Sequence, residues 1–279
     1  MSENKNLWRT FKKNKTALVG SIIAIGIIIT AIAAPLISPY DPLEQDVFHR
    51  LTPPDCSHLF GTDEYGRDIL SRVIWGSRIS LIVGVVSIMV GLAIGTVMGM
   101  VAGYKGGLID TGIMRMVDVL LAFPALITGV MVAALLGPGL DKLIITIGIV
   151  FTPRFARLAY GPTLMIKERE YVYSARVIGA SSFRIVSHYL LPNIFGEVLV
   201  AGTLWVGTAI MTEASLSFLG LGVSPPTPTW GNMIKSGIDR LSNAPWISIF
   251  PGLFILIVVL SFNMIGDGLR DITDPKLRA

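Results

Sequence analysis

Few residues in this chain have the types and spacing that enzyme chemistry or metal binding requires. The histidines His49, His58 and His188 are scattered, and no G-x-x-x-x-G-K-[ST], H-E-x-x-H or G-x-S-x-G motif is present. The single cysteine, Cys56, excludes an internal disulfide and a cysteine-based zinc cluster. The sequence therefore predicts no catalytic residue and no metal site. An intramembrane hydrolase is poorly supported, because no pair of residues could serve as its nucleophile and base.

Glu213 is the one carboxylate that the sequence places deep within an apolar block. It lies among the hydroxyl side chains of Thr208, Thr212, Ser215 and Ser217. Because ionisable residues are costly within a bilayer, such a carboxylate is a candidate functional residue. Two interpretations stay open: Glu213 faces a polar pathway, or hydroxyls on neighbouring helices hold it by hydrogen bonds.

The elements that would position these residues are membrane spans. Of the 279 residues, 52% are hydrophobic and 15% are charged, whereas soluble domains have about 25% charged residues. The apolar residues fall in blocks of about 20, the length that a helix needs to cross a bilayer. Six spans are predicted: 17–37, 79–104, 112–136, 143–160, 194–221 and 246–266.

These spans divide the chain into an N-terminal tail (1–16), a first transmembrane helix (17–37), a loop with a surface helix (38–78), a five-helix core (79–266) and a C-terminal tail (267–279). A cleaved signal peptide is the alternative for the first span. Its apolar stretch exceeds the usual length of about 7–15 residues, which favours a retained helix.

Basic residues predict the orientation. Six spans place both termini on one side, and a cytoplasmic N-terminus puts 16 Lys and Arg residues on inner segments against seven on outer ones. Both termini and loop 161–193 are thus predicted to be cytoplasmic. The net charge of +4 follows this topology, and we expect no nucleic-acid binding, since no basic, water-exposed face with aromatic residues is evident.

Within the second span, glycine recurs every fourth residue, at Gly91, Gly95, Gly99 and Gly103. Small residues allow the close backbone contact that holds helices together in lipid. We expect a helix-packing surface, against this chain or a partner, with a pathway-lining role as the minor alternative.

Other charges near the spans have plainer predicted roles. Asp118 lies three residues from Arg115, which suggests a local ion pair. Arg154 and Arg157 lie near the cytoplasmic end of the fourth predicted span, where long side chains can reach the interface.

Loop 161–193 is long for a connection, and its pattern predicts two short amphipathic helices around Gly179. Glycine can adopt positive φ at such a corner, and Ser181 or Ser182 can cap the second helix. The expected apolar faces are Tyr171, Ala175 and Ile178 before the corner and Phe183, Val186 and Leu190 after it, with Pro192 ending the pattern. The loop could fill a groove on another protein or lie on the membrane surface.

The spacing in this loop resembles the cytoplasmic coupling motif of ABC-importer permeases, E-A-A-x3-G-x9-I-x-L-P. The matching positions are Tyr173, Ser174, Ala175, Gly179, Tyr189, Leu191 and Pro192. Tyrosine replaces the usual glutamate at 173, serine the first alanine at 174 and tyrosine the isoleucine at 189. These departures weaken any specific salt bridge from the motif, but the glycine corner and its spacing are kept.

Longer strings are similar to the dipeptide/oligopeptide permease family, and to the second permease of such systems, which has a long first outer loop. They are Phe60–Asp63 continuing through Gly66–Asp68 to Ser71-Arg72, Met114–Asp118, Ser217–Gly222, Pro225–Gly231 and Phe262–Asp271 followed by Asp274-Pro275. The resemblance implies an all-α, type I ABC importer permease fold. It also implies that the outer loops meet a binding protein, with Asp63, Arg67, Asp68 and Trp230 as candidate contacts.

Without the resemblance, Asp63, Glu64 and Asp68 could suggest calcium, but the EF-hand spacing is absent and an acidic capped turn is the better interpretation. With it, the implied partners are a sister permease, two cytoplasmic ABC ATPases that bind ATP and Mg, an extracytoplasmic peptide-binding protein and membrane lipid. The implied location is the cytoplasmic (inner) membrane of a prokaryote. Import of nickel chelates or other small solutes, and a stand-alone secondary transporter or channel, remain alternatives.

Overall fold

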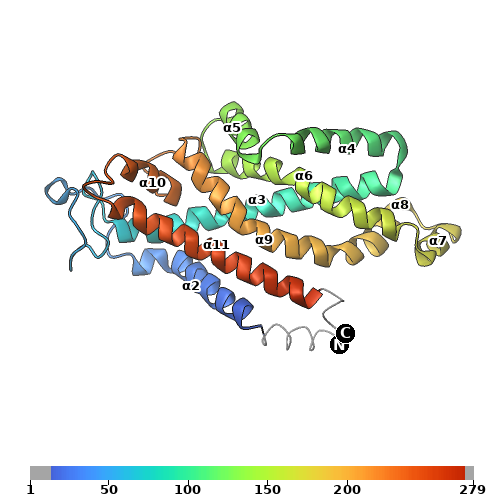
Figure 1. The fold of residues 1–279 in the computed structure, drawn as a ribbon, viewed down its shortest axis with the longest axis horizontal. Helices are drawn as coiled ribbons and strands as arrows, with labels where there is room; N and C mark the ends of the chain where they lie inside the picture. The colour runs from blue at the N-terminus through green and yellow to red at the C-terminus, as the bar shows by residue number, and fades with distance from the viewer. Residues whose placement is uncertain (1–13, 274–279) are drawn as a thin grey trace.

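The computed structural model describes residues 14–273, which form helices joined by loops (Figure 1). Residues 1–13 and 274–279 of the predicted tails lie outside the described residues. The elements are α2 (Lys15–Ile37), a 3-10 turn (Val47–His49), α3 (Ile69–Lys105), α4 (Gly107–Ala122), α5 (Ala125–Leu136), α6 (Leu140–Ile166), α7 (Glu170–Val177), α8 (Ser182–Ile185), a π-helical turn (Val186–Leu190), α9 (Leu191–Phe218), α10 (Trp230–Ile238) and α11 (Trp246–Thr273).

Five segments are long and apolar enough to cross a membrane: α2, α3, α6, α11 and the run from Ser182 to Phe218. α4 and α5 meet the same criterion only when they are taken together, and this pair is bent by 101°. The third span is therefore not the unbroken helix that the block 112–136 predicts. Pro124 causes the break, because it lacks an N–H and holds Phe123 in an extended conformation (φ −90°, ψ 142°).

Several helices run beyond their predicted spans. α3 begins at Ile69, so the surface helix predicted within loop 38–78 is the start of the second span instead. The carboxylate of Asp68 caps this helix by accepting the backbone N–H of Ser71 at 2.7 Å. α11 continues to Thr273, into the predicted C-terminal tail.

α3 runs through the centre of the bundle and packs along α6 (Figure 1). A Cβ added to Gly91 would lie 3.0 Å from the carbonyl oxygen of Gly148, and one added to Gly95 would collide with that of Thr152. The same holds along the whole predicted stripe, Gly91, Gly95, Gly99 and Gly103. The predicted packing surface is confirmed, and its partner is α6 of this chain.

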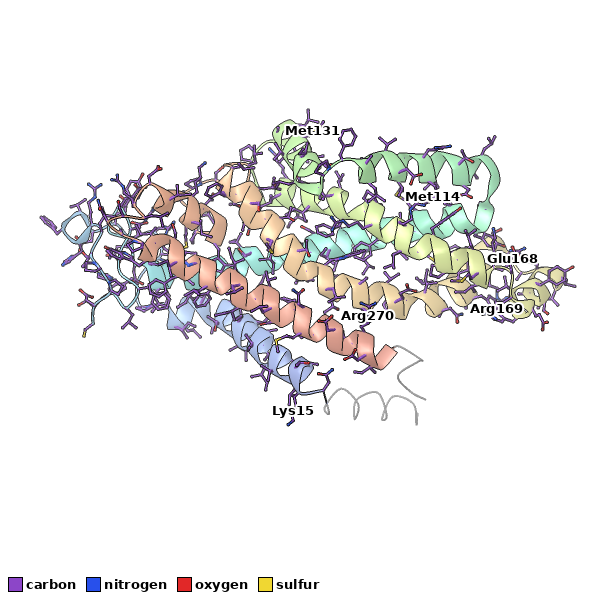
Figure 2. All side chains as sticks on the ribbon, viewed as in Figure 1. Lys15, Met114, Met131, Glu168, Arg169 and Arg270 are labelled. Carbon is purple, nitrogen blue, oxygen red and sulfur yellow. The ribbon has the colours of Figure 1, made fainter. Side chains whose placement is uncertain are left out.

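The two ends of the bundle differ (Figure 1). Loop 38–68 and α10 form one end, which we call the loop end, and α7 lies at the opposite one, the elbow end. Figure 2 shows Glu168 and Arg169 at the elbow end. α2 starts and α11 finishes on the side of the bundle nearer the elbow end, so these two helices run antiparallel to each other.

Candidate partner-docking site

The elbow (residues 170–185) consists of α7, a turn at Gly179 and α8. Gly179 has a φ of +84°, as predicted, and an added Cβ would meet no atom within 4 Å. Its N–H donates to the carbonyl of Arg176, and the N–H of Ala180 donates to the carbonyl of Ala175, both at 3.0 Å. These two bonds form the Schellman arrangement that ends a helix at a glycine. The predicted corner is confirmed.

The second arm of the elbow continues into a span. Ser181 Oγ caps α8 by accepting the N–H of Arg184 at 3.3 Å, as one of the two predicted caps. α8 then passes through the π-helical turn into α9, and Pro192 lies in the first turn of α9. The prediction that Pro192 ends the helix is wrong. The π turn precedes it, and a wider turn accommodates a residue that cannot donate a helical hydrogen bond.

The predicted apolar faces are divided between the inside and the outside. Ala175 is buried, whereas Ile178 is 82% exposed and Phe183 is 81% exposed. Ile178 leaves the face of Ala175 because α7 ends at Val177. The buried side chains that join the elbow to the bundle are Met100, Ala159, Val172, Ile185, Leu190 and Ile194. Tyr171 is partly exposed at 45%, and the more exposed apolar side chains of the elbow, which we call the apolar tip, are Tyr173, Val177, Ile178 and Phe183.

The structure places the seven coupling-motif positions in two groups. Tyr173, Ser174, Ala175 and Gly179 belong to the elbow, and Tyr189, Leu191 and Pro192 lie where it joins α9. A stacked contact links the groups, with the rings of Tyr171 and Tyr189 6.2 Å apart. Tyr173, at the usual glutamate position, is exposed and has no carboxylate to offer.

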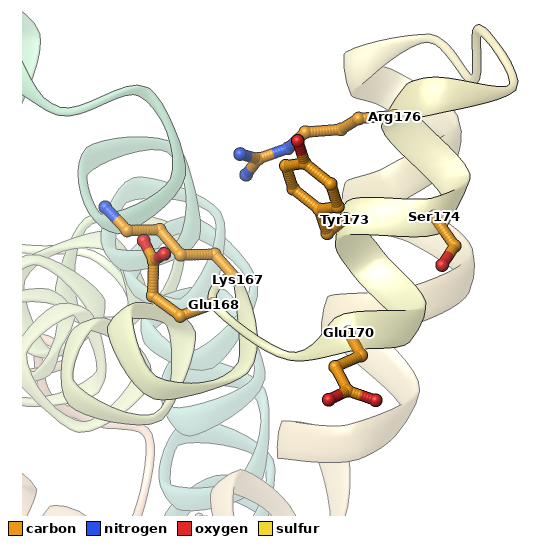
Figure 3. Close-up of a pocket in the computed structure, with 6 residues that line it drawn as sticks. All are labelled: Lys167, Glu168, Glu170, Tyr173, Ser174 and Arg176. Atoms are coloured by element: carbon orange, nitrogen blue, oxygen red, sulfur yellow. The ribbon is translucent and has the colours of Figure 1, made fainter.

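A hollow of about 410 Å³ lies between the end of α6 and α7 (Figure 3). Its lining residues are Lys167, Glu168, Glu170, Tyr173, Ser174 and Arg176. Lys167 Nζ donates to the carbonyl of Gly103 at 2.9 Å, and the Arg176 guanidinium lies 5.2 Å from the centroid of the Tyr104 ring. The first contact holds the end of α6 against the end of α3, and the second holds the elbow there. Sequence reasoning missed them, because their partners on α3 are distant in the chain.

Glu213 is fully buried between α3 and α9. One carboxylate oxygen accepts the hydroxyl of Ser80 at 2.9 Å, and the other accepts that of Ser217 at 2.7 Å. The interhelical hydrogen-bond interpretation is confirmed, and the alternative, that Glu213 faces a pathway, is wrong for this structure. Ser217 was among the hydroxyls considered, but Ser80 was not.

The candidate binding-protein contacts at the loop end are buried. Asp63 forms an ion pair with Arg67 at 2.6 Å, and Asp68 contacts His58 Nδ1 at 3.0 Å besides capping α3. Trp230 donates from Nε1 to the carbonyl of Val73 at 3.0 Å. The prediction that Asp63, Arg67, Asp68 and Trp230 touch a partner directly is therefore corrected. The three charged residues fold loop 38–68, because buried charges need partners within the chain, and Trp230 joins α10 to α3.

The charges of α4 and α6 also differ from prediction. Asp118 pairs with Arg157 of α6 rather than with Arg115. Arg154 lies near the middle of the 27-residue α6, because this helix continues to Ile166. That Arg154 reaches the membrane interface stays a prediction, because the length of α6 alone does not place this helix in the bilayer.

This fold is that of an ABC importer permease. A chain of the MetNI methionine ABC transporter, solved in inward facing conformations, has a TM-score of 0.61 and 19% identity and covers 74% of this chain and 98% of its own. Residues 95–279 match the family described as binding-protein-dependent transport system inner membrane component. Residues 4–54 match the N-terminal TM domain of oligopeptide transport permease C. The chain belongs to the binding-protein-dependent transport system inner membrane components.

Curated relatives agree over nearly the whole length. The dipeptide transport system permease protein DppC of Alkalihalophilus pseudofirmus is 42% identical over 99% of this chain and 90% of the relative. The di/tripeptide transport system permease protein of Pseudomonas aeruginosa is 42% identical over 98% and 92%. The glutathione transport system permease protein GsiD of Escherichia coli is 44% identical over 97% and 90%. Family membership favours an importer subunit over a stand-alone transporter or channel.

Proposed function

We propose that this chain is a permease subunit that carries di- or oligopeptides across the cytoplasmic membrane of a prokaryote, together with a sister permease. It is not itself an enzyme: two partner ABC ATPases bind ATP and Mg, and an extracytoplasmic binding protein delivers the peptide. The names of the relatives, which specify dipeptide, di/tripeptide and glutathione transport, support a peptide cargo over a nickel chelate.

The observation that carries this proposal is the elbow. An isolated membrane subunit has no reason to expose four apolar side chains on a capped, rigid corner outside its spans. Such a tip fits a hydrophobic groove on another protein, in the way that helices are commonly recognised. We assign that groove to the partner ATPase, with the elbow end in the cytoplasm as the count of basic residues favours.

Replacing Gly179 tests the coupling role. Valine at φ +84° is strained although no neighbouring atom blocks it, so Gly179→Val should distort the corner without disturbing the bundle. We expect normal membrane assembly, but peptide uptake reduced at least about tenfold relative to ATP hydrolysis, since a loss of about 1.4 kcal/mol of docking free energy suffices for a tenfold effect.

Two variants control this experiment. Asparagine tolerates the left-handed conformation, so Gly179→Asn should retain most uptake. Gly161→Val, on α6 and also without a neighbour within 4 Å of an added Cβ, should transport normally. Normal uptake by Gly179→Val would refute the coupling role. ATPase stimulation of the reconstituted complex by nickel chelates but not by peptides would refute the cargo.

A further inference from the structure

A stripe of polar side chains joins α4 to α6. On α6, Arg154, Arg157 and Tyr160 are spaced three residues apart and share one face. Tyr160 donates to Asp110 of α4 at 2.9 Å. Arg157 forms its ion pair with Asp118 of α4, and the two side chains are 46% and 48% exposed. The stripe is therefore accessible along its length rather than sealed between the helices.

Arg154 is the member of the stripe without an acid opposite it. α4 and α6 run antiparallel, and the register that pairs Asp118 with Arg157 brings Leu121 towards Arg154 at a small hollow by the α4–α5 bend. Within residues 14–273, no carboxylate lies within ion-pair distance of this guanidinium. The guanidinium lies over the ring of Phe151, whose centroid is 5.1 Å away.

Arg154 is also too deep to reach the end of its helix. At a rise of about 1.5 Å per residue, it is about 21 Å from Leu140 and about 18 Å from Ile166 along the axis. By contrast, residues 16–37 of α2 and 246–266 of α11 contain no charged side chain. A half-exposed ion pair and an unpaired guanidinium within a membrane-spanning helix are costly against lipid, so we infer that this face meets water or protein.

We propose that the α4–α6 stripe lines the aqueous pathway and that Arg154 binds the terminal carboxylate of the peptide as it crosses. A guanidinium holds a carboxylate by two parallel hydrogen bonds, which suits a group common to peptides of any sequence. The Asp118–Arg157 pair, one turn away, presents charge of both signs to the rest of a zwitterionic peptide. This assignment rests on the proposed peptide-import function.

Thiol reactivity beside Arg154 tests this proposal in the reconstituted complex. Ile149 lines the same hollow, so Ile149→Cys in a Cys56→Ser background places a thiol next to the guanidinium. Its reaction rates with a sulfonate and with a trimethylammonium methanethiosulfonate give a ratio that reports local charge. We expect Arg154→Gln to lower the sulfonate-to-ammonium ratio about tenfold, because loss of one positive charge weakens both the attraction of the sulfonate and the repulsion of the ammonium reagent.

Matched variants and ligands sharpen the result. Lys142→Gln removes a charge from the first turn of the same helix and should leave the ratio unchanged. Arg154→Lys keeps the positive charge and should leave the ratio within about twofold of the wild-type value. This result would show that the effect of Arg154→Gln comes from lost charge and not from misfolding. A dipeptide should slow the sulfonate reaction during turnover, whereas the same dipeptide with an amidated C-terminus should not.

Three outcomes overturn the assignment: a ratio insensitive to Arg154→Gln, no reaction of Ile149→Cys with either reagent while uptake proceeds, or equal protection by the free and amidated dipeptides. Failure of the wild-type complex to import peptides contradicts the proposed function instead. The two failures are therefore distinguishable.

Discussion

At Glu213 both carboxylate oxygens are occupied, one by Ser80 of α3 and the other by Ser217 one turn along α9. A buried polar group without partners is costly, and here two short bonds satisfy the carboxylate and join two spans. The surroundings of Ser217 are closely packed, because a Cβ added to Gly222 would collide with the Ser217 hydroxyl. Glu213 thus helps to hold α3 against α9.

Glu213→Leu should destabilise the folded protein by about 1–3 kcal/mol, because two buried hydroxyls lose their acceptor. The thermal unfolding midpoint of the purified protein in detergent measures this loss. The triple variant with Ser80→Ala and Ser217→Ala should recover part of it, since no unpaired hydroxyl remains. Glu197→Leu, an exposed carboxylate on the same helix, serves as the control. A Glu213→Leu midpoint equal to that of the wild type would refute the structural role.

At the scale of elements, α3 and α6 show why glycine spacing matters more than hydrophobicity in a bundle of this kind. Lipid tails are as apolar as the helices, so contact depends on how closely two backbones approach. The stripe at every fourth residue of α3 places hydrogen atoms where other side chains would strike the α6 backbone.

Alanine substitutions at two glycines should therefore have opposite effects. Gly95→Ala places a Cβ against the carbonyl of Thr152 and 2.7 Å from Phe155 Cβ, an overpacking that should cost about 1–3 kcal/mol. Gly112→Ala, on α4 with open space around it, should stabilise its helix by up to about 1 kcal/mol. Unfolding midpoints of both variants report the sign, and a stabilising Gly95→Ala would contradict the α3–α6 packing.

Local sequence patterns predicted these elements well, but they did not predict which residues pair between segments that are distant in the chain. The glycine stripe and the Gly179 corner follow from spacing within one segment, and both are confirmed. Five of the six predicted spans are single apolar helices, and the sixth corresponds to the bent pair α4 and α5. Ser80 and Arg157 were missed as partners, because neither Glu213 nor Asp118 indicates in sequence which helix lies beside it. The bend at Pro124 had a local signal, but the surrounding apolar block obscured it.

At the scale of the whole molecule, the two ends of the bundle differ in which residues they bury and which they expose. The loop end buries Asp63, Arg67, Asp68 and Trp230, although Val47 and Phe48 are exposed there, and the elbow end leaves its apolar tip uncovered on a capped corner. The prediction of binding-protein contacts was wrong because charged residues in the motif were expected to lie on the surface. In the structure these charges are buried and pair with one another. The elbow was predictable because a glycine corner between short helices has a local signature.

Photo-crosslinking from the elbow tests the central claim most directly. The assembled complex would carry benzoylphenylalanine at Phe183, which is 81% exposed at the elbow end, or at Phe48, which is 92% exposed at the loop end. The account predicts that the Phe183 position crosslinks to the partner ATPase and that the Phe48 position does not. Crosslinking of the ATPase from the Phe48 position, with none from the Phe183 position, would contradict both the docking site and the orientation.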